Sequence, residues 1–124
     1  IRHRRHILAV LADVEGGADS LAEIDFTKLA RQAGLPPPLR QAIRLDASGR
    51  RRYLDVDFGT FSVEVDGGVH LQVLTAIDDA KRQIDLTLVG QRILRFPSIV
   101  VRTEPEYVVA KLRAAAHVFG LPGR

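Results

Sequence analysis

The middle of the chain holds four side chains whose types and spacing could do chemistry together: Asp55, Glu64, Asp66 and His70. They belong to the stretch RRYLDVDFGTFSVEVDGGVH, residues 51–70, in which two runs of alternating apolar and polar residues flank Gly59-Thr60. Alternation around a two-residue turn predicts a β-hairpin, and counting outward from the turn places Asp55 opposite Glu64. Like charges that face each other across a sheet repel. We therefore expect something to offset them: solvent, an arginine or lysine, a raised pKa or a divalent cation.

This acidic face has two interpretations. Mg²⁺ is typically held by one or two carboxylates together with water and substrate phosphates, which Asp55 and Glu64 could supply. Asp66 lies two residues beyond Glu64 on the same face, and His70 follows closely after Gly67-Gly68. The alternative is an exposed polar face, with Asp66 as a strand-end residue and Glu23 as part of a capping box with Ser20.

Length and composition restrict the class of protein to which the chain can belong. The chain has 124 residues, of which 46% are hydrophobic, and this is enough for one domain with a buried core, residues 1–124. It contains no cysteine, which excludes disulfides and thiolate metal sites and fits a cytoplasmic protein. No apolar run is long enough for a membrane span, and no secretory signal is evident. The sequence starts at Ile1 and lacks methionine, so it can be the C-terminal part of a longer chain.

Basic residues are unevenly distributed. The net charge is +3, which is compatible with nucleic acid as a partner. One group of candidate phosphate contacts lies at the start of the hairpin and another in the next helical segment: Arg50, Arg51, Arg52, Lys81 and Arg82. Basic groups around an acidic metal pocket are what a metal-dependent phosphodiesterase requires. The alternative is a mixed, solvated surface.

The rest of the pattern must position these residues. After a short amphipathic segment at residues 2–13, we expect the order helix, three strands, helix, strand, helix. The expected ranges are 20–32, 41–46, 52–58, 61–66, 71–88, 92–96 and a last helix that opens with a capping box at Thr103. The strand at 92–96 follows a crossover helix and can run parallel to a central strand. This predicts a mixed α/β (α+β) fold with the hairpin at the centre of the sheet and helices on its faces.

The order and spacing of several segments resemble the restriction-endonuclease-like PD-(D/E)XK superfamily. The resemblance is closest to a bacterial domain related to the very-short-patch-repair endonucleases, as found at the C-terminus of actinobacterial type IV antitoxin-like proteins. It covers nearly the whole chain and is carried by GGADSLAEIDFTKLARQAGLPPP (16–38), RRYLDVDF (51–58), VEVDGGVH (63–70), DDAKRQIDLTLVGQRILRF (78–96) and PEYVVAKLRAA. It implies an αβββαβα core with a central mixed sheet.

The resemblance also implies roles for single residues. Asp55 matches the first motif acid, although Leu54 stands where proline is expected, and Glu64 matches the second. Glu23 matches the acid of the first core helix, and Glu23 or Asp66 could complete the metal shell through water. His70 matches a histidine of the repair-type relatives and could act as a general base near neutral pH. Asp66 stands where the motif has its lysine, so the role of that lysine must pass to His70, to Lys81 or Arg82 on the next helix, or be lost.

Two functions follow as expectations. The first is a Mg²⁺- or Mn²⁺-dependent endonuclease that hydrolyses phosphodiester bonds, with DNA as the expected substrate and a homodimer as a possible assembly. The second is a catalytically inactive module with the same fold, inside a DNA-binding regulator or antitoxin. The departure at Asp66 favours the second.

Overall fold

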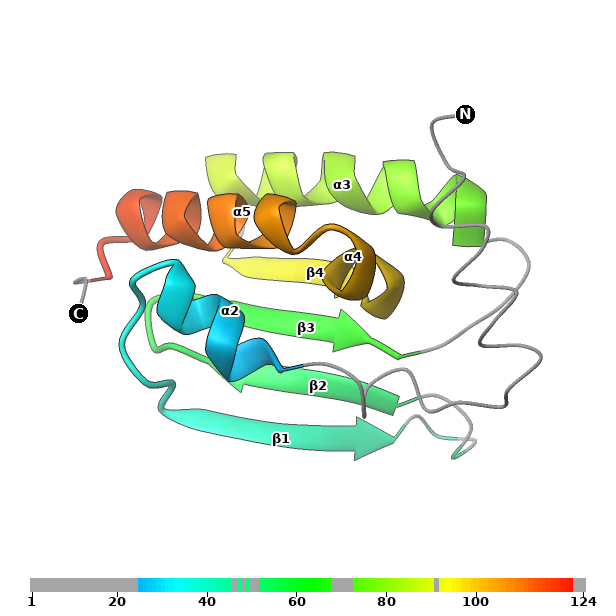
Figure 1. Ribbon diagram of the computed structural model, residues 1–124, viewed down its shortest axis with the longest axis horizontal. Helices are drawn as coiled ribbons and strands as arrows, with labels where there is room; N and C mark the ends of the chain where they lie inside the picture. Colours follow the sequence, from blue (N-terminus) through cyan, green and yellow to red (C-terminus); the bar gives the residue numbers. More distant parts are fainter. Residues whose placement is uncertain are drawn as a thin grey trace.

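The described residues form a four-stranded mixed sheet with helices packed on it. The computed structural model describes residues 25–45, 47, 49, 52–67, 73–90 and 92–121. Within them the strands follow the order β1-β2-β3-β4, with β1 (Arg40–Leu45), β2 (Arg52–Asp57), β3 (Ser62–Asp66) and β4 (Ile93–Pro97). The first three pair antiparallel, and β4 runs parallel to β3 after the helical crossover. Figure 1 shows β1 and β4 at the two edges, so the hairpin lies at the centre as predicted.

The hairpin has the predicted register. Asp55 pairs with Glu64, Val56 with Val63, and Tyr53 with Asp66. The turn is closed by the Phe58 amide, which donates to the Phe61 carbonyl at 3.0 Å. The two phenylalanine rings stack with centroids 5.2 Å apart. The pattern of alternating residues therefore predicted the pairing correctly, residue by residue.

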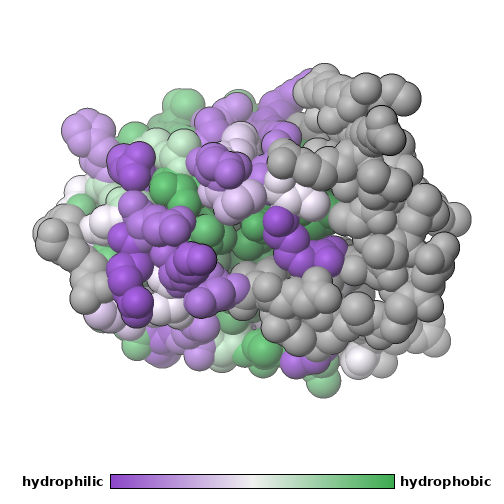
Figure 2. All heavy atoms as spheres, viewed as in Figure 1, coloured by the Kyte–Doolittle hydropathy of each residue, from purple (hydrophilic) through white to green (hydrophobic). Residues whose placement is uncertain are grey.

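The described helices gather on one face of the sheet (Figure 1). They are α2 (Phe26–Gln32), α3 (Val73–Val89), α4 (Ser98–Thr103) and α5 (Pro105–Val118). One core joins their apolar side chains to alternate residues of β2, β3 and β4; its strand members are Leu54, Val56, Val63, Val65, Leu94 and Phe96. Figure 2 shows mainly hydrophilic residues on the described part of the surface above these helices. None of the described helices has the length and apolar character needed to cross a membrane.

The observed helix ends agree only in part with the capping residues predicted from the sequence. Gly34 follows α2 with φ of 82°, the left-handed conformation expected of a glycine at a helix end. Asp25 caps α2, because its carboxylate accepts from the Lys28 amide at 3.0 Å, whereas the predicted Ser20 box lies outside the described residues. The predicted capping box at Thr103 is wrong. Thr103 ends α4, which the sequence did not predict, and its hydroxyl donates to the Ile99 carbonyl at 2.6 Å.

The hairpin turn should be sensitive to any side chain at Gly59. Gly59 has φ of 93°, and a Cβ there would lie 3.1 Å from Cδ1 of Leu39. We expect Gly59→Ala to lower the free energy of unfolding by about 1–2 kcal/mol, the cost of a left-handed residue that carries a side chain. Urea unfolding followed by circular dichroism measures this.

Gly90→Ala is the matched control for that change. Gly90 has no positive φ, and a Cβ there would meet nothing within 4 Å. We expect its effect to stay within about 0.5 kcal/mol. Equal effects of the two variants would contradict the turn geometry.

Candidate functional site

The acidic pair lies on the face of the sheet that the described helices leave open. Strand side chains alternate between faces, so Asp55 and Glu64 point away from the core that Val56 and Val63 help to build. Their carboxylates belong to directly opposed residues of the two central strands. Glu64 is the more covered of the two, with 24% of its side chain exposed. The sheet therefore brings the predicted pair together.

Arg44 of β1 bridges this pair. Its Nε donates to Oδ2 of Asp55 at 2.9 Å, and its Nη2 donates to Oε1 of Glu64 at 2.5 Å. The guanidinium also lies over the ring of Tyr53, 4.4 Å from the centroid. The hydrogen bond to Asp55 is the main cause that raises the pKa of Arg44 above its ordinary value. A single cation thus offsets the like charges that the register places opposite each other.

Two further arginines extend the network across the sheet. Nε of Arg95 on β4 lies 3.3 Å from Oε2 of Glu64, so both oxygens of Glu64 face an arginine. Arg40 on β1 donates to Oδ2 of Asp57 at 3.3 Å. These groups line a shallow hollow of about 400 Å³ on the open face. We call Arg40, Arg44, Asp55, Asp57, Glu64 and Arg95 the ionic cluster.

As arranged, the acidic pair does not fit a bound Mg²⁺. Mg²⁺ requires oxygen ligands in near-octahedral geometry. Here one guanidinium lies between Asp55 and Glu64, and the second oxygen of Glu64 faces Arg95. A divalent cation placed between the carboxylates would have to displace a positive charge. Within the described part of the chain, no three histidine or acidic side chains are grouped so that they could hold a metal.

Lys81 and Arg82 do not join the acidic pair. They lie on α3, which packs on the core face of the sheet. Nζ of Lys81 is 2.9 Å from Oε1 of Glu104 and 5.0 Å from the centroid of the Tyr107 ring. Lys81 therefore links α3 to α5, and neither residue lies where it could replace the motif lysine. A phosphate contact elsewhere by either residue stays a prediction.

The remaining predicted site residues are placed only in part. Asp66 ends β3 opposite Tyr53, on the same face as Glu64. Arg52 begins β2 opposite Leu45, and its carbonyl accepts from the Gly67 amide at 2.8 Å. Four predicted residues lie outside the described part of the chain: Glu23, Arg50, Arg51 and His70.

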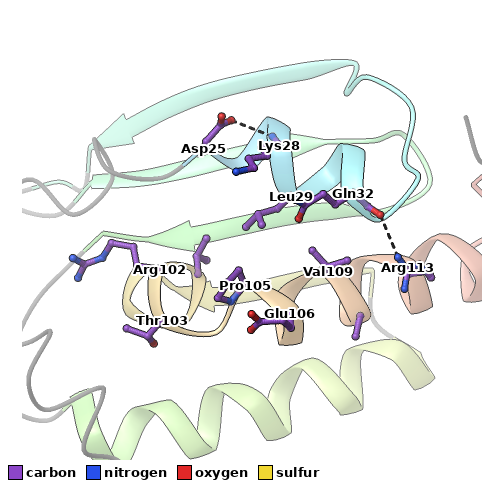
Figure 3. A pocket seen from close by; sticks show the side chains of 12 residues that line it. Asp25, Lys28, Leu29, Gln32, Arg102, Thr103, Pro105, Glu106, Val109 and Arg113 are labelled. Atoms are coloured by element: carbon purple, nitrogen blue, oxygen red, sulfur yellow. Dashed lines mark hydrogen bonds between the residues drawn. The ribbon is translucent and has the colours of Figure 1, made fainter.

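A second concavity lies between α2 and the α4–α5 pair, with a volume of about 870 Å³ (Figure 3). Apolar side chains such as Leu29 and Val109 line it together with charged ones of both signs. At one end Arg113 donates to the Gln32 carbonyl at 3.2 Å. None of the predicted site residues lines this groove.

Sequence reasoning missed Arg44, although a signal for it was present. The strand expected at 41–46 alternates, which puts Arg44 on the face opposite Ile43. Pairing that strand with 52–58 through the turn at 47–49 places Arg44 opposite Tyr53, two residues from Asp55 and on the same face of the sheet. The same pairing places Arg40 opposite Asp57. Arg95, on the opposite edge strand, pairs with the same Glu64 from the other side of the hairpin.

Asp57 should make stability depend on pH in the acid range. The Gly59 amide, which donates to its carboxylate at 2.8 Å, and then Arg40 hold the pKa of Asp57 below the ordinary 3.8. A carboxyl with a depressed pKa in the folded state adds stability above its unfolded pKa and loses it as the pH falls through the folded pKa. We expect Asp57→Asn to destabilise the protein at neutral pH and to flatten the acid side of its stability curve. Urea unfolding from about pH 2 to 7 measures this.

The Asp57 pKa itself provides the control. In Arg40→Gln an NMR titration should show it rising only part of the way, because the Gly59 amide still donates to the carboxylate. An Asp57 that titrates at its ordinary value in the unchanged protein would contradict the turn and the ion pair together.

Comparison of the chain with protein-family models, with curated proteins and with solved structures finds no match. What the site can do is therefore inferred from its own residues.

Proposed function

We propose that this chain is a non-catalytic module with a nuclease-like sheet, which binds nucleic acid without cutting it as part of a DNA-binding regulator or antitoxin. The observation that carries this proposal is the bridge from Arg44 to both Asp55 and Glu64. The two acids that a nuclease would use for a metal are already hydrogen-bonded to arginine. Asp66 at the position of the motif lysine supports the same conclusion.

The sheet supports the nuclease-like part of the proposal. The resemblance implies three consecutive strands, a helical crossover and a fourth strand, with the acids on the central hairpin. The order β1-β2-β3-β4, with β4 parallel to β3, agrees with that arrangement. A cytoplasmic location is part of the proposal and rests on the absence of cysteine.

Charge supports nucleic acid as the partner. The chain carries a net +3, and its sequence isoelectric point is about 9.8. On the open face, Arg40 and Arg95 stand on opposite sides of the acidic pair, and Arg40 has 84% of its side chain exposed. Arginines positioned in this way can contact the phosphate backbone while Arg44 remains on the carboxylates.

The binding test compares labelled DNA and RNA, duplex and single-stranded, by fluorescence anisotropy with EDTA or with Mg²⁺. We expect binding that weakens with salt and is unchanged by EDTA. The double variant Arg40→Gln/Arg95→Gln should bind several-fold more weakly, with a salt dependence smaller by about two phosphate contacts. Arg31→Gln, an exposed position on α2, is the control and should bind as the unchanged protein does. Failure to bind any of these nucleic acids would refute the proposal.

The competing proposal is an endonuclease that depends on Mg²⁺ or Mn²⁺. Its support is the direct opposition of Asp55 and Glu64 on the central strands, with both side chains on the open face. It requires Arg44 to leave the pair. Metal-dependent cleavage that disappears in both Asp55→Asn and Glu64→Gln would establish it, and calorimetric Mg²⁺ binding lost in the same variants would support it.

A further inference from the structure

The outer edge of β1 combines exposed apolar side chains with unoccupied strand-pairing positions. β1 pairs with β2 on one side, and in the described part of the sheet no strand pairs with it on the other. All six residues of β1 are exposed. Ile43 and Leu45 expose 52% and 57% of their surface on the side of the sheet that carries the helices. An apolar edge strand of this kind is a template for pairing with another strand.

The two charged residues of β1 do little to protect this edge. Proteins often block edge strands with charged side chains that repel an incoming strand. Here Arg40 reaches inward to Asp57, and Arg44 reaches inward to Asp55 and Glu64. Both guanidinium groups thereby reach β2, and that of Arg44 also reaches β3. The ionic cluster therefore directs both positive charges of β1 toward the neighbouring strands, although Arg40 stays largely exposed.

We propose that β1 pairs antiparallel with β1 of a second copy of this chain. The two-fold axis passes between the two copies of Ile43, which face each other, and is called here the axis through Ile43. The two sheets then join edge to edge into one continuous sheet. This inference does not depend on the proposed function, because it rests on β1 alone.

The sequence of β1 disfavours the two symmetric registers adjacent to this one. An axis through Ala42 would place Arg40 opposite the partner copy's Arg44, and an axis through Arg44 would place that residue opposite itself. Like charges directly opposed across a sheet are destabilising. The axis through Ile43 instead sets Ile43 against Ile43, Leu45 against Gln41 and Arg44 against Ala42. It covers the exposed isoleucine and opposes no like charges.

Cysteine cross-linking tests both the dimer and its register, because the chain contains no cysteine of its own. In Ile43→Cys the two thiols of a dimer face each other across one strand pair, within the range of a disulfide. In Leu45→Cys the two copies of residue 45 stand four residues apart along the strands, roughly 13 Å, which is too far. We expect mild oxidation to cross-link Ile43→Cys and to leave Leu45→Cys uncross-linked.

Sedimentation provides the independent measurement. The unchanged protein should sediment as a dimer, and Ile43→Lys should raise the dissociation constant at least about tenfold. Leu86→Lys, at a similarly exposed position on α3 (56%), should leave it unchanged.

Two results would overturn the proposal. The first is a protein that stays monomeric up to about 100 µM. If the introduced thiol of Ile43→Cys is protected from thiol reagents in such a monomer, another segment of the same chain, such as residues 1–24, covers β1 instead. The second is a dimer that persists in Ile43→Lys and that oxidation does not cross-link in Ile43→Cys.

Discussion

Replacing Phe96 with alanine is expected to lower the free energy of unfolding by about 3–5 kcal/mol, the usual cost of removing a buried aromatic ring. Phe96 lies on β4 opposite Val65, and its side chain is almost completely buried against the helices. The ring fills the core beneath the strand that positions Arg95 on the opposite face. Urea unfolding followed by far-ultraviolet circular dichroism measures the effect without relying on tryptophan, which the chain lacks.

Ile93→Ala on the same strand is the matched control. Side chains of a strand point alternately to its two faces. Leu94 and Phe96 point into the core, so Ile93 points to the open face, where it is exposed. Its truncation should cost well under half as much as that of Phe96. Phe96→Leu provides a milder change if the alanine variant does not fold. Equal losses at the two positions would mean that the open face is covered in the folded protein, and the ionic cluster would then not be a contact surface.

The hairpin could be predicted in detail because its determinants are local. Period-two alternation fixes which side chains share a face, and the two-residue loop fixes the register. Together these gave Asp55 opposite Glu64, which the structure confirms. The parallel pairing of β4 was also predictable, since a strand after a crossover helix commonly returns parallel to the strand before it.

Elements that depend on tertiary contacts could not be predicted in the same way. α4 follows β4 directly, and its six residues are too few to show helical periodicity. Three consecutive apolar residues, Ile99 to Val101, are buried there because the core surrounds them. Thr103 resembled a capping residue because Glu106 follows three positions later. Its hydroxyl instead donates backward to Ile99, an alternative open to threonine at a helix end.

In the candidate site, too, the locally determined part was predictable and the part that depends on tertiary contacts was not. The acidic pair follows from the register of one hairpin, whereas the residues that bind it come from β1 and β4, on either side of that hairpin. Lys81 could not be assigned from its own helix, because its partner Glu104 lies 23 residues later. The alternation of the hairpin therefore predicts that two carboxylates are opposed, but not whether a metal ion or an arginine offsets their charge. The offsetting group comes from neighbouring strands, whose residues the local sequence of the hairpin does not specify.

Replacing Arg44 with methionine is expected to destabilise the protein and to make its stability respond to divalent cations. Methionine keeps an apolar stem over Tyr53 but removes the charge that lies between Asp55 and Glu64. The opposed carboxylates then repel each other across the sheet. We expect a lower thermal midpoint than in the unchanged protein, and a partial recovery in millimolar MgCl₂ that KCl of equal ionic strength does not give.

Two controls separate this explanation from its alternatives. Arg40→Met, which removes a more exposed arginine that bonds to one carboxylate, should lower the midpoint less and show no response to Mg²⁺. Asp55→Asn added to Arg44→Met removes one of the two opposed charges, so it should restore part of the midpoint and abolish the response. A Mg²⁺ response already present in the unchanged protein would show that Arg44 gives way to the metal, and would favour the endonuclease. A response that appears only after Arg44 is removed would show that this arginine occupies the position a metal would need, which is the premise of the non-catalytic module.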